Sequence, residues 1–174
     1  MRQLPRELSR SQRYGHALAL LNCDIDGFKQ FNDGLGHQVG DTLLRAFVER
    51  AEGCIRKDSD WVARVAGDEF MLVLPETHVH GAHCVAQKLR EVFASKPVST
   101  SAGPVNFTVC VGITAMQAVP ERGDMPRADA LLRAAGRGLH ASKTRGVDRV
   151  TAAAVSTDIT IAVGSPTGND HGIH

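Results

Sequence analysis

Residues 64–70 read Arg-Val-Ala-Gly-Asp-Glu-Phe, and the interpretation of the whole chain starts from this stretch. Apolar residues flank it on both sides, at 61–65 and at 70–74. Two short apolar runs around a small-residue turn predict a β-hairpin. The turn of that hairpin would carry the adjacent carboxylates of Asp68 and Glu69.

A second apolar run, residues 17–25, also leads into acidic residues. Asp24 stands at its end, and Asp26, two residues later, is expected to point the same way in an extended chain. If this strand neighbours the hairpin, its carboxylates meet those of Asp68 and Glu69. Anions at that density repel by several kcal/mol at an effective dielectric constant of about 20, unless a cation binds them. The pattern therefore indicates a Mg²⁺–nucleotide site, with solvated turn acids as the alternative.

The remaining pattern predicts an α/β (α+β) fold in the order β-α-β-β-α-β-α-β. Apolar residues recur with helical spacing at 39–56, 79–94 and 127–143, and further strands are expected at 105–115 and 149–155. Small-residue loops are expected at 99–104 and 120–126. Helices beside a hairpin favour a ferredoxin-like, mixed or antiparallel five-stranded sheet flanked by helices. We expect a linker or the end of a first helix at 1–15, one domain at 16–155 and a flexible tail at 156–174.

Composition narrows the classes of function. The 174 residues carry a formal net charge of +1 and 43% apolar residues, which predicts one globular domain and argues against a DNA-binding surface. No apolar run approaches the roughly 20 residues of a membrane span. The four cysteines lie far apart and are expected to be buried free thiols in a reducing cytoplasm, rather than a disulfide or zinc site. Three clustered histidines, His78, His80 and His83, are expected to begin a helix rather than to hold a metal.

Several further motifs follow in a fixed order along the chain. They are DIDGFK (24–29), ND (32–33), GH (36–37), GD (40–41), RVAGDEF (64–70), TVCVG (108–112) and the segment 135–150. In these motifs the chain resembles the GGDEF family of diguanylate cyclases over about residues 10–155, with Ala66 where the family has its first glycine. The resemblance implies a fold like that of nucleotide cyclases and polymerase palm domains.

The resemblance also implies a reaction. Two domains, each holding one GTP, face each other as a homodimer and condense the substrates to cyclic di-GMP and two pyrophosphates. Asp24, the carbonyl of Ile25, Asp68 and Glu69 would hold Mg²⁺ (or Mn²⁺). Asp68 and Glu69 would be the catalytic residues, with Glu69 helping to activate the ribose 3′-hydroxyl that attacks the α-phosphate.

Substrate contacts follow from the same resemblance. Asn32 and Asp41 would select guanine, because an amide and a carboxylate together match its donor and acceptor edge. Lys29 and Lys143 would meet the β- and γ-phosphates. The nucleotide would pass close to the backbone at Ala66 and Gly67. The alternatives are a plain turn at 32–34 and a role for Asp41 as an N-cap or first-turn acid of the following helix.

The family's inhibitory site for cyclic di-GMP falls on a basic motif just before the hairpin. At the positions of that motif this chain has Lys57 and Asp60. Arg56 is adjacent to them, and Lys88 on the following helix would be a second basic contact. Lysine lacks the planar guanidinium fork, so the site is expected to be degenerate. The alternative is that Arg56, Lys57 and Lys88 are ordinary surface charges.

Two departures predict reduced activity. Ala66 adds a methyl group where the nucleotide approaches the backbone, and Val147 stands where the family has a phosphate-binding arginine. Loss of one charge-assisted contact costs roughly 1.5–3 kcal/mol; Arg145 is a possible substitute. The main alternative is a catalytically degenerate module that binds cyclic di-GMP or GTP in signalling, and a third possibility is an inert interaction domain. The resemblance further implies a bacterial cytoplasmic protein whose N-terminal sensory or receiver module is missing from this chain.

Overall fold

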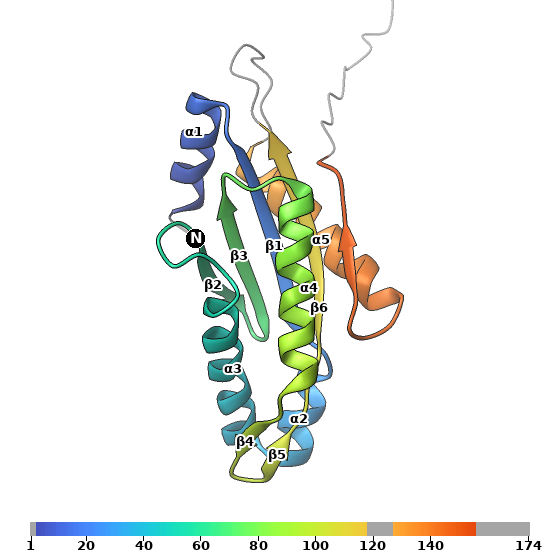
Figure 1. The fold of residues 1–174 in the computed structure, drawn as a ribbon. Coiled ribbons are helices and arrows are strands. Elements are labelled where there is room, and N and C mark those ends of the chain that lie inside the picture. The colour runs from blue at the N-terminus through green and yellow to red at the C-terminus, as the bar shows by residue number, and fades with distance from the viewer. Residues whose placement is uncertain (1–2, 118–126, 156–174) are drawn as a thin grey trace, which may run out of the picture.

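The computed structural model describes residues 3–117 and 127–155 (Figure 1). The loop expected at 120–126 and the tail expected at 156–174 lie outside these residues. The described elements are α1 (Leu4–Tyr14), β1 (Ala17–Ile25), α2 (Phe28–Leu35), α3 (His37–Glu52), β2 (Trp61–Ala66), β3 (Glu69–Pro75), α4 (Val79–Ser95), β4 (Val98–Thr100), β5 (Gly103–Val105), β6 (Val109–Gln117), α5 (Ala128–Thr144) and β7 (Val150–Ala152).

The main sheet has five strands in the order β2-β3-β1-β6-β7. The neighbouring pairs are antiparallel except β6 and β7, which run parallel. A mixed five-stranded sheet with flanking helices confirms the predicted fold class. Because β1 pairs with β3 in the antiparallel direction, the C-terminal end of β1 lies beside the start of β3.

Helices cover both faces of the sheet (Figure 1). One layer packs α3 and α4 on the sheet, with Phe47 stacked between Phe70 at 4.0 Å and Phe93 at 5.0 Å. The other layer packs α1 and α5 against alternate residues of β1, including Leu18 and Leu20. The central strand is consequently buried along its whole length, and its polar residues Asn22 and Asp24 continue the row that begins with Leu18 and Leu20.

Close backbone contact seats α5 on β6. A Cβ atom on Gly112 would lie 2.0 Å from the backbone nitrogen of Leu139, and one on Gly138 would lie 3.0 Å from the Cα of Gly112. Only glycine fits at both positions, because backbone atoms cannot move aside as a flexible side chain does. This contact fixes the end of α5 that carries Lys143 relative to the central strands.

One expectation and two of the alternatives for local structure are wrong. Residues 32–34 lie within α2 rather than in a plain turn, since left-handed Gly27 (φ 71°) and Gly36 (φ 89°) delimit a short helix there. Residue 41 therefore falls in the second turn of α3, so Asp41 is neither its N-cap nor a first-turn acid. Residues 99–104 form most of a small hairpin, β4 paired with β5, instead of a loop.

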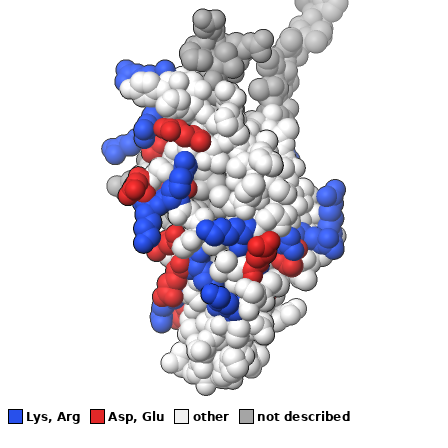
Figure 2. Space-filling model, viewed as in Figure 1, with Lys and Arg blue, Asp and Glu red and all other residues white. Residues whose placement is uncertain are grey.

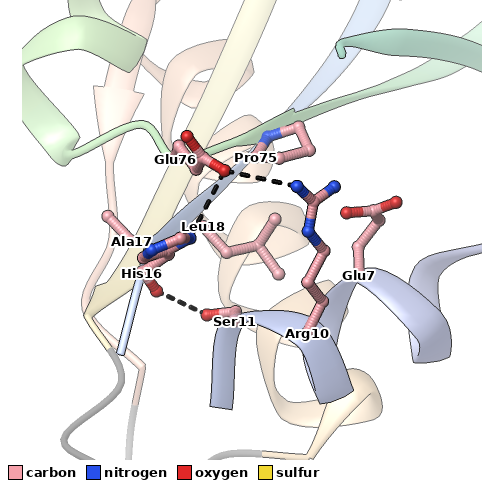
Figure 3. A pocket seen from close by; sticks show the side chains of 8 residues that line it. All are labelled: Glu7, Arg10, Ser11, His16, Ala17, Leu18, Pro75 and Glu76. Atoms are coloured by element: carbon pink, nitrogen blue, oxygen red, sulfur yellow. Dashed lines mark hydrogen bonds and ion pairs between the residues drawn. The ribbon is translucent and has the colours of Figure 1, made fainter. Parts of the chain in front are cut away.

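Helix α1 occupies most of residues 1–15 and is tied to the junction between β3 and α4 (Figure 3). Glu76 at that junction forms an ion pair with Arg10 at 3.6 Å and lies 3.3 Å from His16 Nδ1. The Ser11 hydroxyl donates to the carbonyl of His16 at 2.6 Å and secures the turn out of the helix. The residues that line the small hollow in Figure 3 therefore hold α1 against the sheet, away from the acidic end of β1.

Candidate functional site

The acidic ends of β1 and of the hairpin meet in the sheet. Asp24 is directly opposite Glu69 in the β1–β3 register, and Ile25 is the last residue of β1. Asp68 belongs to the turn between β2 and β3, next to Glu69. Antiparallel pairing of the two strands therefore produces the juxtaposition that the sequence predicted.

Asp24 is the most unusual ionisable group at this edge. It is only 6% exposed, and its Oδ2 accepts from Lys143 Nζ at 2.6 Å. Burial raises the pKa of Asp24 to about 6; the Lys143 hydrogen bond opposes this rise, and the charges of Asp68 and Glu69 add to it. The pKa of Asp24 thus stays raised beside an ammonium group because the cost of burying the carboxylate, with a smaller contribution from two neighbouring acids, exceeds the effect of Lys143.

Lys143 responds to the same charges. Burial works against its ammonium form, but the hydrogen bond to Asp24 and the charges of Asp24, Asp68 and Glu69 outweigh burial and raise the pKa of Lys143. The lysine side chain remains 45% exposed. It is thus a charged, partly solvated group at the mouth of the acidic edge.

The donor atoms suit a divalent cation. Three carboxylates and a strand-end carbonyl form a set of hard oxygen ligands, as Mg²⁺ and Mn²⁺ prefer. Within 3–117 and 127–155, however, no three acidic, histidine or cysteine side chains are already gathered closely enough to hold a metal. Asp24 is drawn to Lys143, while Glu69 Oε1 accepts from Asn22 Nδ2 at 3.5 Å.

The prediction that Asp26 points the same way as Asp24 is wrong. Its Oδ2 accepts from the Thr108 hydroxyl at 2.6 Å and from the backbone N–H of Asp148 at 2.8 Å. The strand ends at residue 25 and the chain turns at left-handed Gly27, so strand alternation does not extend to residue 26. Asp26 therefore faces β6 and the segment after α5.

The hairpin turn is held by an arginine whose role the sequence did not reveal. Arg64 Nε donates to the carbonyl of Gly67 at 2.7 Å, and Gly67 is left-handed with φ of 50°. Among described residues other than glycine, positive φ occurs at Glu76 and Asp148, so Ala66 has an ordinary backbone conformation. The turn requires glycine at position 67 rather than at position 66.

The residues expected to select guanine lie at the contact of α2 with α3. The Asn32 side chain covers Gly40, where an added Cβ would come 2.0 Å from Asn32 Oδ1. The next residue, Asp41, lines a hollow of about 570 Å³. The other lining residues, which sequence reasoning did not identify as a pocket, are Leu44, Arg45, Val48, Glu49, Arg64 and Phe70. Lys29 lies exposed in the first turn of α2.

Three of the four predicted inhibitory-site residues share another hollow, of about 650 Å³. Arg56, Asp60 and Lys88 line it, while Lys57 is not among its lining residues. Arg56 is already engaged: its guanidinium reaches Asp60 Oδ1 at 2.7 Å and the carbonyl of Pro75 at 2.5 Å. Lys88 Nζ donates to the carbonyl of Gly53 at 3.3 Å. A phosphate ligand would have to compete with these internal contacts.

Val147, at the position of the missing arginine, is 65% exposed. It lines a hollow of about 270 Å³ together with Gly27, Gln30, Phe31 and Thr108. The segment after α5 consequently presents an apolar side chain beside the start of α2. Arg145 caps the end of α5, where its backbone N–H donates to the carbonyl of Ser142.

Within residues 3–117 and 127–155, the cysteines and histidines form no metal-binding group. Cys23, Cys54 and Cys110 are buried free thiols, but Cys84 lies exposed on α4, contrary to expectation. His78 precedes α4 as its N-cap, and His80 and His83 lie within its first turns. None of the described helices is long and apolar enough to cross a membrane. Positive and negative side chains are interspersed on the face shown in Figure 2, as the small net charge suggests.

Comparisons with known proteins agree with the fold. The family model "Diguanylate cyclase, GGDEF domain" matches residues 1–149. The cyclic di-GMP phosphodiesterase NbdA of Pseudomonas aeruginosa is 39% identical over 132 residues, which are 76% of this chain and 16% of that protein. The chain spans less than half the length of the curated relatives that it matches most strongly.

Solved structures resemble the fold over most of the chain. The active GGEEF domain of a diguanylate cyclase from Vibrio cholerae has a TM-score of 0.76 and 28% identity, with 89% of this chain and 93% of that chain covered. The GGDEF domain of DgcB from Caulobacter crescentus, solved with cyclic di-GMP, has a TM-score of 0.77 and 26% identity, with 87% and 86% covered.

Proposed function

Because the chain belongs to the GGDEF family of diguanylate cyclases, we propose that it condenses two GTP molecules to cyclic di-GMP and two pyrophosphates, with reduced activity. The observation that carries this proposal is the pairing of Asp24 with Glu69 at the end of the central strand, beside Asp68 and Lys143. These four charged groups supply what metal-assisted nucleotidyl transfer needs: oxygen ligands, an acceptor for a proton and a cation for phosphate.

The residues would divide the chemistry as follows. A divalent cation, held by Asp24, the Ile25 carbonyl, Asp68 and Glu69, supplies Lewis acidity toward the phosphate and the attacking hydroxyl. Glu69 accepts the proton of the ribose 3′-hydroxyl. That oxygen forms a bond to the α-phosphorus of the GTP held by the second copy, and the bond from this phosphorus to the pyrophosphate oxygen breaks. Two such transfers close the ring, so each copy contributes half of the site.

Other side chains would orient the substrate. Asn32 and Asp41 would bind the guanine edge from the contact of α2 with α3, where the Asn32 side chain covers Gly40 and the next residue, Asp41, lines a hollow. Lys29 and Lys143 would bind the β- and γ-phosphates, and the partly exposed Lys143 would exchange its contact with Asp24 for one with phosphate. Ala66 and Gly67, in the exposed hairpin turn, would lie along the nucleotide.

The direct test measures cyclic di-GMP formed from GTP and Mg²⁺ by the full chain, over a wide range of protein concentrations. We expect product from the unmodified chain and from Glu52→Ala, which removes an exposed acid at the end of α3. Asp68→Ala should give none. Equal product from the unmodified chain and Asp68→Ala, at every concentration, would refute the proposed synthesis.

Restoring the missing arginine should increase activity. Val147 is exposed beside the start of α2, so an arginine there fits without repacking the core, and it would supply the phosphate contact that the family resemblance implies at this position. One charge-assisted contact contributes roughly 1.5–3 kcal/mol, which corresponds to about 10- to 100-fold in kcat/KM. Cyclase kinetics of Val147→Arg would measure this. Val147→Gln is the uncharged control, and an equal gain in both variants would show that charge is not the missing element.

A second candidate function is a receptor module that binds cyclic di-GMP or GTP without turnover. The hollow lined by Arg56, Asp60 and Lys88 favours it, as does Val147 in the site itself. The bound ligand reported for DgcB is consistent with such binding. Titration calorimetry with each nucleotide decides between the two functions, because tight binding without product indicates a receptor and absence of binding excludes both.

We place the domain in the bacterial cytoplasm, where GTP is available, as part of a longer protein. The chain covers 16% and 22% of two of its relatives, which supports further domains, and the family resemblance implies that one of them is a sensory or receiver module on the N-terminal side. Helix α1, clamped to Glu76 through Arg10 and His16, would transmit the signal from that module. The module would also bring two copies together for catalysis.

A further inference from the structure

Asp26 has a role different from that of the acidic residues around it. A single oxygen, Oδ2, accepts from the Thr108 hydroxyl at 2.6 Å and from the backbone N–H of Asp148 at 2.8 Å. The backbone N–H of Asp26 also donates to the carbonyl of Thr108 at 3.0 Å. These contacts bind Asp26 to Thr108, directly before β6, and to the segment after α5.

The segment that Asp26 holds is strained and needs anchoring. Asp148 has a left-handed backbone, with φ of 54°, which is costly for a residue other than glycine. Its carboxylate forms two hydrogen bonds with Arg90 of α4, each 2.7 Å long. Asp148 is thus fixed twice, through its side chain by Arg90 and through its backbone by Asp26.

This anchor lies between the groups that the reaction would use. Asp26 follows Ile25, whose carbonyl is a proposed metal ligand, and residues 145–149 follow the end of α5, which carries Lys143. Val147, within the anchored segment, lines the hollow beside Gly27. A displacement of the segment would therefore move Val147 and change the hollow beside Gly27 and the start of α2.

We infer that Asp26 is a positioning residue, which ties the segment 145–149 to the end of β1 through one acceptor oxygen, rather than a metal ligand. The first part of this inference concerns structure alone, and its consequence for nucleotide binding rests on the proposed function. Because both hydrogen bonds end on one oxygen, an asparagine side chain supplies the same acceptor without the charge. At a metal ligand, by contrast, asparagine keeps an oxygen but loses the charge that attracts the cation, so cation binding should weaken.

The test compares Asp26→Asn, Asp26→Ala and Thr108→Val with the unmodified chain, Asp24→Asn and the exposed control Glu52→Ala. Two quantities are measured for each full-length variant. The first is hydrogen exchange of the Asp148 amide without ligand. The second is the affinity, with Mg²⁺, for 3′-deoxy-GTP, which lacks the attacking hydroxyl and cannot be converted to product.

We expect Asp26→Asn to keep the Asp148 amide protected and to bind the analogue within about 3-fold of the unmodified chain. Asp26→Ala should lose protection and weaken binding by about 10- to 100-fold, as is usual when a group that orients a ligand is removed. Thr108→Val keeps the Asp148 bond and should fall between them. If Asp26→Ala does not fold, Thr108→Val and Asp26→Asn still give the comparison.

Two results would overturn the inference. Binding lost in Asp26→Asn as completely as in Asp24→Asn, with the Asp148 amide still protected, would make Asp26 a metal ligand. Undiminished protection in Asp26→Ala would show that the tie does not hold the segment. If the unmodified chain binds no analogue, the proposed function fails, and hydrogen exchange alone decides whether Asp26 anchors residues 145–149.

Discussion

Asp24→Asn should abolish cyclic di-GMP synthesis and, at the same time, raise the free energy of unfolding of the domain. The catalytic loss follows from removal of a charged metal ligand. Metal stabilisation of developing charge is worth several kcal/mol, so kcat should fall by about 10³-fold or more. The gain in stability is expected because a charged carboxylate that is only 6% exposed is costly to bury, and asparagine removes that charge.

The sign of the stability effect follows from the pKa of Asp24. Folding raises this pKa from an ordinary 3.8 to about 6, so the folded chain binds the proton more tightly than the unfolded chain. The resulting stabilisation is fully present below about pH 4 and is lost as pH rises through about 6. Asparagine resembles the protonated side chain at every pH, and the variant should therefore gain about 1–3 kcal/mol above pH 6 and almost nothing near pH 4.

Denaturant unfolding in a chelator, at about pH 4 and about pH 8, measures this difference. Glu52→Gln is the matched control, since removal of an exposed acid should change stability by less than about 0.5 kcal/mol. Added Mg²⁺ should stabilise the unmodified chain and leave Asp24→Asn unchanged. A variant that is less stable than the unmodified chain at about pH 8 would show that the Lys143 ion pair outweighs the burial cost.

The sequence predicted the strands and the long helices because their apolar residues repeat with clear periods. It did not predict α2, since eight mixed residues between two left-handed glycines carry little periodic signal. The β4–β5 hairpin was missed for a similar reason, because residues 99–104 lack apolar alternation. Short elements in this chain are set by backbone turns rather than by buried stripes.

The candidate site was predictable only as far as strand pairing determines it. The opposition of Asp24 and Glu69 follows from two neighbouring antiparallel strands. The ion pair of Lys143 with Asp24 depends instead on how closely α5 approaches β6, which packing at Gly112 and Gly138 allows. Likewise, Arg56 and Asp60 were expected to face a ligand, and their mutual ion pair depends on how the loop between α3 and β2 closes.

The base specificity of the site should depend on Gly40. A Cβ added there would lie 2.0 Å from Asn32 Oδ1 and 3.0 Å from Asn32 Cγ, so Gly40→Ala must push the Asn32 side chain away. Alanine favours the α3 helix by about 1 kcal/mol, and the fold should therefore persist. Loss of the Asn32 contacts, about 1–3 kcal/mol, should weaken GTP binding by about 10- to 100-fold and reduce the preference for GTP over ATP.

Gly34→Ala is the matched control for this prediction. Gly34 lies in α2, close in sequence to Asn32, but a Cβ there would meet nothing within 4 Å. Both variants gain helix propensity, and Gly40→Ala alone displaces the amide, so calorimetric titration with GTP and ATP separates recognition from stability. If Gly40→Ala binds GTP as the unmodified chain does, Asn32 does not contact the base, and guanine recognition must come from Asp41 and the other residues of its hollow.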